Sequence, residues 1–140
     1  MEDILSTVAP QARRAKSGRT SAAGAIVLIV ENEALIRWNA VQMVEDAGYI
    51  ALEAENADDA ILIIKRRRDI GAVFTDVHMS GSGSGLQLAR AVRRRWPPIH
   101  LIVTSGLPAK EKLPPGSYFI RKPYENASVV ALLHELFDGT

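Results

Sequence analysis

The chain has 140 residues, of which 47% are hydrophobic and 24% are charged, and its formal net charge is +1. These values fit a single globular domain, and the near-neutral charge argues against a general nucleic-acid or membrane surface. Because the chain has no cysteine, a disulfide framework, a thiolate nucleophile and a thiolate metal site are excluded. The sequence has neither a bilayer-spanning run nor a secretory signal, so we expect a cytoplasmic protein.

Residues 1–24 differ from the rest of the chain in composition. They contain Arg13, Arg14, Lys16 and Arg19 and show little apolar periodicity. This pattern predicts a flexible basic leader, followed by one domain over residues 25–140. The basic residues could contact a partner, although a solvated segment is favoured.

From residue 25 onward, strand-like apolar runs alternate with segments of helical periodicity. Strands are predicted at 25–30, 49–54, 71–76, 99–104 and 118–121. Helices are predicted at 33–47, 57–68, 86–96 and 126–137. The segment 107–116 contains three prolines, so any helix in it must be short. We expect each strand to be apolar on both faces, which predicts a doubly wound α/β fold with a parallel sheet covered on two sides.

The third predicted strand ends in a carboxylate, Asp76, and a loop rich in Gly and Ser follows it. A charge is costly inside a buried strand, so we expect Asp76 at the carboxyl end, where open α/β sheets bind their ligands. The alternative is an aspartate that only caps the next turn. Which interpretation applies depends on the other residues at this edge of the sheet.

Polar residues follow three further strands and would meet Asp76 in one crevice. They are Glu31 and Asn32 after the first strand, Thr104 and Ser105 at the fourth, and Lys122 after the fifth. An ionised Asp76 can attack a phosphorus centre and form an acyl phosphate. Lys122 would neutralise the phosphoryl oxygens, and the Thr104 hydroxyl would hydrogen-bond one of them.

The same crevice offers oxygen ligands for a divalent cation. Mg²⁺ prefers a few oxygen ligands and keeps several waters. Glu31, Asn32, Asp76 and a backbone carbonyl near His78 could supply those oxygens.

In order and spacing, these residues resemble the receiver domain of bacterial two-component response regulators over about residues 25–138. The matching features are the pair Glu31-Asn32, the phosphoacceptor position Asp76, Thr104, and the pair Lys122-Pro123. The resemblance implies a flavodoxin-like sheet of order 2-1-3-4-5 and phosphotransfer from a histidine kinase or histidine phosphotransfer protein. It also implies Mg²⁺ dependence, self-hydrolysis of the acyl phosphate, an unknown downstream protein target, and a cis bond before Pro123. Such a chain is a signalling phosphoacceptor and not an enzyme.

The sequence departs from the family pattern at several places. Asn32 replaces the usual metal-binding aspartate, which should weaken Mg²⁺ binding. Ser80 and Ser84 replace a proline and an aspartate of the loop after Asp76, which should make that loop less rigid. The segment between Thr104 and Lys122 looks short, which puts the fourth helix in doubt. No output domain follows in the given sequence, so the resemblance is to a stand-alone receiver.

Phe119 occupies the position at which the family uses an aromatic rotamer as a switch. In that interpretation, phosphorylation would draw Thr104 inward and leave space for Phe119 to turn in. The alternative is an ordinary core phenylalanine, and the sequence favours neither.

Two other classes of function stay open from the sequence. The first is a degenerate receiver that binds proteins without phosphorylation, because Asn32 removes a ligand charge. The second is a small flavin-binding protein, for which only His78 and Tyr124 are available near the site.

The basic runs 65–68 and 93–95 lie at helix carboxyl ends, where they complement the helix dipole, and they favour a solvated face over nucleic-acid binding.

Overall fold

The computed structural model describes residues 24–78, 84–106 and 113–139. Within these ranges, strands and helices alternate along the chain as far as β5, as predicted, and β6 then follows β5 with no described helix between them. The strands are β2 (Ile26–Val30), β3 (Ile50–Ala54), β4 (Ile70–Asp76), β5 (His100–Ser105) and β6 (Tyr118–Arg121). The helices are α1 (Ala34–Asp46), α2 (Ala57–Arg66), α3 (Gly85–Arg95) and α4 (Asn126–Asp138). The predicted leader, the loop at 79–83 and most of the proline-rich segment lie outside the described residues, and residues 113–117 form no helix.

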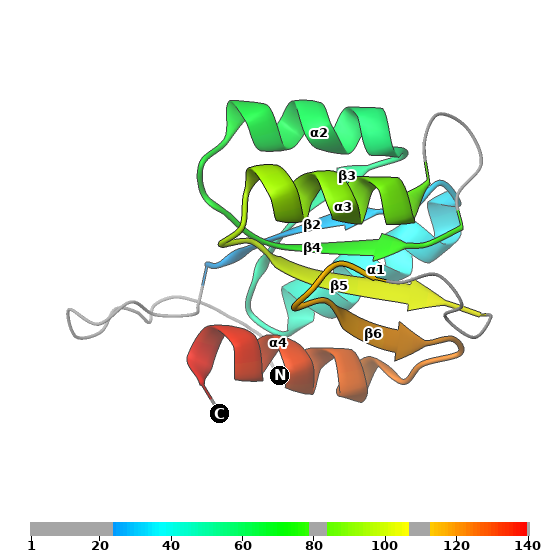
Figure 1. The fold of residues 1–140 in the computed structure, drawn as a ribbon. Helices are drawn as coiled ribbons and strands as arrows, with labels where there is room; N and C mark the ends of the chain where they lie inside the picture. Colours follow the sequence, from blue (N-terminus) through cyan, green and yellow to red (C-terminus); the bar gives the residue numbers. More distant parts are fainter. Residues whose placement is uncertain (1–23, 79–83, 107–112, 140) are drawn as a thin grey trace.

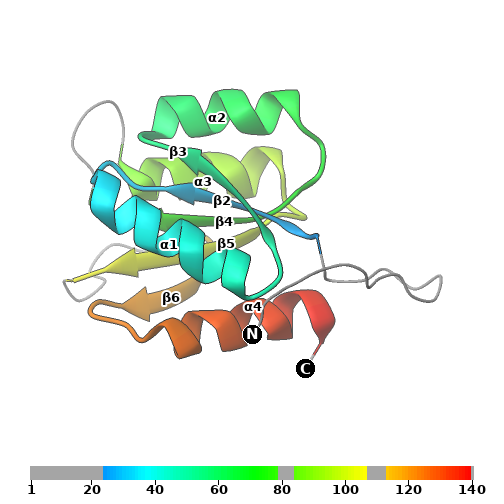
Figure 2. The ribbon, with the colours of Figure 1, turned by 180° about the vertical axis from the view of Figure 1, so that it is seen from behind.

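The sheet has five strands, and its order is β3-β2-β4-β5-β6. All four neighbouring pairs are parallel. When the five strands are numbered from one in chain order, this is the predicted arrangement 2-1-3-4-5. Figures 1 and 2 show α2 and α3 on one face of the sheet and α1 and α4 on the other. The predicted doubly wound fold is therefore confirmed.

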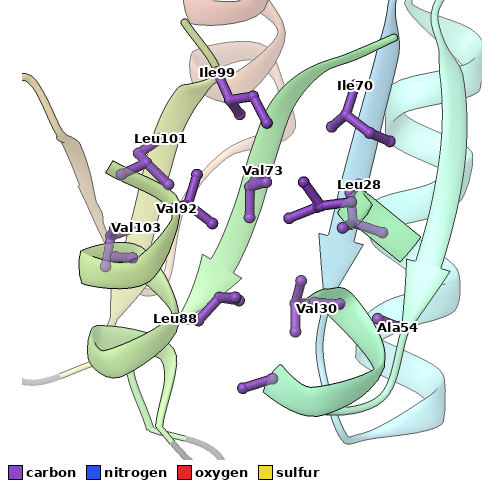
Figure 3. Close-up of a cluster of buried hydrophobic side chains, with 14 of the residues drawn as sticks. Leu28, Val30, Ala54, Ile70, Val73, Leu88, Val92, Ile99, Leu101 and Val103 are labelled. Carbon is purple, nitrogen blue, oxygen red and sulfur yellow. The ribbon is translucent and has the colours of Figure 1, made fainter. Parts of the chain in front are cut away.

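Two apolar layers fill the spaces between the sheet and its helices. The first contains Leu28, Val73 and Leu101 from the strands, packed against Leu88 and Val92 of α3 (Figure 3). The second contains the alternate residues of the same strands, packed against α1 and α4; it includes Val27, Ile29, Phe74, Ile102, Val44, Val129 and Leu133. Because successive residues of a strand point to opposite faces, the central strands are apolar on both faces up to the polar residues at the carboxyl ends of β4 and β5.

The expectation that every strand is apolar on both faces is wrong for the two edges of the sheet. Only Ala54 is buried in β3, and β6 has no fully buried residue. An edge strand has a neighbour on one side only, and β6 has no described helix over the face that Phe119 shares with Val103. Phe119 is 37% exposed, so the core interpretation of this residue is also wrong.

Candidate functional site

The carboxyl edge of the sheet collects the buried polar residues of the described chain. They are Glu31 directly after β2, Thr75 and Asp76 at the end of β4, and Thr104 and Ser105 at the end of β5. The register pairs Asp76 with Thr104, and Thr104 in turn with Ile120. Parallel strands that end together bring these side chains to one place, and Glu31, Asp76, Thr104 and Lys122 line one small hollow there. The structure thus brings these four predicted residues together.

Asp76 uses both of its carboxylate oxygens. Its Oδ2 accepts a hydrogen bond from Lys122 Nζ at 2.5 Å. Its Oδ1 accepts one from the backbone N–H of His78 at 3.1 Å, which closes a turn two residues on. Turn capping and a charged site, which the sequence presents as alternatives, therefore coexist in one side chain.

Lys122 is held in place by the sheet and by two carboxylates. Its backbone N–H donates to Ser105 O at 2.9 Å, directly after β6. Its ammonium group also lies 3.9 Å from Glu31 Oε1. Burial opposes the charged form, but the hydrogen bond with Asp76 and the charges of Asp76 and Glu31 outweigh it and raise the pKa of Lys122. The charged form of Lys122 is therefore stabilised between the two carboxylates.

Glu31 is buried at the start of the turn that leads into α1. Burial raises the pKa of its carboxyl group, and a hydrogen bond of 3.0 Å from the backbone N–H of Glu33 to Oε2 opposes that rise. This bond also satisfies a free N–H near the beginning of α1, whose N-cap residue makes no side-chain cap. Glu31 is thus a carboxylate that the fold keeps desolvated beside Lys122.

Thr104 is 4% exposed, and its hydroxyl has no hydrogen-bond partner among the described residues. Its backbone carbonyl accepts from Val77 N–H at 2.9 Å, which ties the end of β5 to the segment after Asp76. A buried hydroxyl without a partner is costly, and such groups are rare. Thr104 therefore offers a hydrogen-bond donor next to the Asp76–Lys122 pair.

Gly85 fixes how α3 begins beside Asp76. A Cβ atom at this position would lie 1.7 Å from the backbone oxygen of Asp76. The backbone N–H of Gly85 donates to Val77 O at 3.0 Å, and Ser84 and Gln87 form a reciprocal capping box at the same helix end. The helix thus packs on the strand end with no room for a side chain.

The residues present fit a hard divalent cation. Glu31 follows β2 and Asp76 ends the neighbouring strand β4, and Mg²⁺ binds proteins through one or two carboxylates with waters and phosphate oxygens. Among the described residues, no group of three or more acidic, histidine or cysteine side chains is placed to hold a metal. Asn32 and a backbone carbonyl near His78 therefore stay predictions as further ligands.

Two residues of this region, Gly85 and Arg37, were not selected from the sequence. Gly85 packs against Asp76, and Arg37 reaches the backbone of Glu31. Tyr124, which the sequence analysis considers only as a flavin contact, lines the hollow. Tyr124 also contacts Phe74, with 5.9 Å between ring centroids, and burial raises its pKa. The bond before Pro123 is cis, as the resemblance implied.

The fold and its edge define a class of protein: a doubly wound α/β domain with an aspartate, a lysine and a hydroxyl at the carboxyl ends of its strands. A model of the response regulator receiver domain matches residues 27–134. The chain belongs to the response regulator receiver domain family, whose members serve two-component signalling.

Relatives and solved structures agree with this assignment. The nitrogen assimilation regulatory protein NtrX of Azorhizobium caulinodans is 32% identical over 112 residues, which are 76% of this chain and 24% of that protein. The phosphate regulon transcriptional regulatory protein PhoB of Pseudomonas aeruginosa is 40% identical over 72 residues, which are 51% of this chain and 30% of that protein. The chain thus spans about a quarter of the length of the curated relatives it matches first.

Among solved structures, a response regulator receiver protein from Sinorhizobium medicae has a TM-score of 0.76 and 25% identity. The match covers 84% of this chain and 98% of that one. A CheY-like receiver domain protein from Methanospirillum hungatei also has a TM-score of 0.76, at 21% identity, with 83% and 95% of the two chains covered.

Within the described ranges, none of the helices has the length and apolar character needed to cross a bilayer.

Proposed function

We propose that this chain accepts a phosphoryl group from a phosphohistidine onto Asp76 and signals through protein contacts. A carboxylate oxygen of Asp76 attacks phosphorus, the P–N bond breaks, and its electron pair returns to the imidazole of the donor. Water later attacks the acyl phosphate and releases inorganic phosphate, so that Asp76 is regenerated. The donor would be a histidine kinase or a histidine phosphotransfer protein, and the chain would serve as a phosphoacceptor and not as an enzyme with a separate substrate.

The observation that supports this most directly is the partnerless buried hydroxyl of Thr104 beside the Asp76–Lys122 ion pair. A phosphoryl group on Asp76 would bring oxygens that accept hydrogen bonds from both Thr104 and Lys122. Donors held in advance where negative charge arrives stabilise it without reorganisation. Mg²⁺ on Glu31, Asp76 and Asn32 would neutralise further negative charge on the phosphoryl oxygens.

A second candidate function is a degenerate receiver that signals by binding alone. Two observations favour it: Asn32 occupies a position at which the family has a ligand carboxylate, and only two carboxylates of the described residues line the hollow. Asp76, Thr104 and Lys122 are all in place, which favours phosphorylation.

The test is intact-mass measurement after incubation with acetyl phosphate, with and without Mg²⁺. We expect one Mg²⁺-dependent phosphoryl adduct, which Asp76→Asn abolishes. Asp69→Asn is the matched control, because it makes the same chemical change at an exposed aspartate that forms an ion pair with Arg67. No adduct with acetyl phosphate or with a histidine kinase would favour the degenerate receiver.

A further inference from the structure

Arg37 lies in the first turns of α1 and joins the edge strand β3 to the acidic turn after β2. Its Nε donates to Glu53 Oε1 at 3.1 Å, and its Nη1 donates to the backbone oxygen of Glu31 at 2.8 Å. The Arg37 side chain is only 14% exposed, whereas that of Glu53 is 53% exposed. The guanidinium group is thus fixed at two points, one of which is the main chain of a residue in the site.

The backbone of Glu31 is consequently held from both sides. Its N–H donates to Ala54 O at 3.0 Å, which continues the ladder between β2 and β3 one residue beyond the paired strands. Its carbonyl accepts from Arg37. The ladder ends here, because the chain then turns into α1. Without Arg37, the carbonyl of the peptide that joins Glu31 to Asn32 would lose the hydrogen bond that the guanidinium donates to it.

We propose that Arg37 is a positioning residue that sets the Glu31–Asn32 turn for cation binding. This inference rests on the proposed function, since it concerns the same site. Arginine suits the task because its planar guanidinium donates two hydrogen bonds in a fixed geometry, which the single ammonium of lysine cannot do. Arg37 itself touches neither the phosphoryl group nor the cation and acts through the main chain of Glu31.

The charge of Arg37 has an opposite consequence that must be separated from its geometry. A cation near the turn repels Mg²⁺, so that its removal by itself would tighten binding. Glu53 counters part of that charge through the ion pair. A role in positioning therefore predicts that binding weakens when Arg37 is lost, and an effect of charge alone predicts that it strengthens.

The experiment measures the Mg²⁺ dissociation constant from the increase of unfolding free energy with Mg²⁺ concentration in urea titrations. This readout needs no phosphorylation, and it separates Mg²⁺ affinity from the stability of the metal-free chain. We expect Arg37→Ala and Arg37→Lys each to weaken Mg²⁺ binding about tenfold, as loss of outer-shell partners of metal ligands does. An unchanged constant for Arg37→Lys together with tighter binding for Arg37→Ala would overturn the proposal.

Two further variants make the result specific. Arg67→Ala is the matched control, because it breaks another arginine–carboxylate pair, with Asp69 at 2.9 Å, at the far end of α2. It should leave the Mg²⁺ constant unchanged. Glu53→Ala removes the exposed partner, so it should fold and weaken binding severalfold. The double variant with Arg37→Ala should be no worse than Arg37→Ala alone, since Glu53 acts through Arg37.

The outcomes distinguish this inference from the proposed function. If the unsubstituted chain binds Mg²⁺ and forms the adduct while the Arg37 variants keep its Mg²⁺ constant, only the positioning role is wrong. If the unsubstituted chain shows no stabilisation by Mg²⁺ and no adduct, both proposals are wrong. Additive losses of Mg²⁺ affinity in the double variant would show that Glu53 acts independently. They would overturn the inference that Glu53 acts through Arg37.

Discussion

The two ends of the sheet differ in whether their charged side chains are buried or exposed. At the carboxyl end, Glu31 and Asp76 are buried, and Lys122 lies between them. At the amino end, α2 and α3 finish side by side in two basic runs, 65–68 and 93–95, most of which is exposed (Figure 1). Burial of a charge is costly, whereas an exposed charge costs little. Buried charge with organised partners therefore indicates the functional end better than the number of charges does.

The most severe way to break the carboxyl end is to add one methyl group at Gly85. The new Cβ would overlap the backbone oxygen of Asp76, and no side chain can move away to relieve the contact. We expect Gly85→Ala to lower the free energy of unfolding by at least about 3 kcal/mol in urea titrations, the upper end for overpacking. We also expect it to abolish the adduct in intact-mass measurements.

Gly106→Ala is the matched control for this prediction. It also lies near the site, but among the described residues its Cβ would approach only Lys122 Cβ, at 4.0 Å. Its unfolding free energy should change by less than about 0.5 kcal/mol. Equal losses for the two glycine variants would contradict the close packing of α3 on Asp76.

Asn32→Asp tests whether an additional carboxylate at the carboxyl end of the sheet strengthens Mg²⁺ binding. If Asn32 supplies a cation ligand, a carboxylate in its place should tighten Mg²⁺ binding on the order of tenfold. Urea titrations at several Mg²⁺ concentrations give the constant. Asn39→Asp makes the same change on an exposed part of α1 and should leave it unaltered. An unchanged constant for Asn32→Asp would count against its assignment as a ligand.

The amino end should give a smaller effect, which depends on pH. Burial and then the charge of Arg93 lower the pKa of His100 from its usual 6.5. Below about pH 6.5, the unfolded chain therefore binds this proton more readily than the folded chain, and stability falls as the pH decreases through that range. His100→Gln should reduce this loss between pH 7.5 and 5.5 in urea titrations.

Arg94→Gln is the control for the histidine variant, because it removes one exposed cation at the same end and leaves His100 in place. Its pH profile should be parallel to that of the unsubstituted chain. A profile for His100→Gln that is also parallel would show that His100 contributes nothing to the pH dependence.

The smallest effect is expected for the exposed arginines of the amino end. Arg66, Arg68 and Arg94 pair with no described carboxylate. The triple variant Arg66→Gln, Arg68→Gln and Arg94→Gln should leave the yield of the phosphoryl adduct unchanged. Each substitution should alter the unfolding free energy by no more than about 0.5 kcal/mol, as is usual for surface positions. A marked loss of adduct would show that charge at the amino end also serves the site.

The fold could be predicted from the sequence because each element has its own pattern. The central strands are short continuous apolar runs, and the helices have regular apolar spacing with clear ends. The buried site was also predictable, since polar residues at the ends of parallel strands must share one edge. Asp76, Thr104 and Lys122 could be found in this way.

The remaining features depend on tertiary contacts that no local pattern records. Arg37 looks like any charged residue of a surface helix, and only the folded chain shows its contacts with Glu53 and with the backbone oxygen of Glu31. The exposure of Phe119 depends on what covers an edge strand and not on its own apolar character. The sequence shows Gly85 only as a glycine at the end of the loop after Asp76. Its contact with Asp76 follows from the packing of α3.

The short edge strand β6 has a consequence for the native-state dynamics of the chain. It is four residues long, pairs only with β5, and immediately precedes Lys122. Short, exposed edge segments open locally at a fraction of the global unfolding free energy. Amide hydrogen exchange should therefore be faster in β6 than in β2, β4 and β5, and each such opening would withdraw Lys122 from Asp76 while the core stays folded. The lifetime of the assembled site would then be set by the fraying of one strand and not by the stability of the domain.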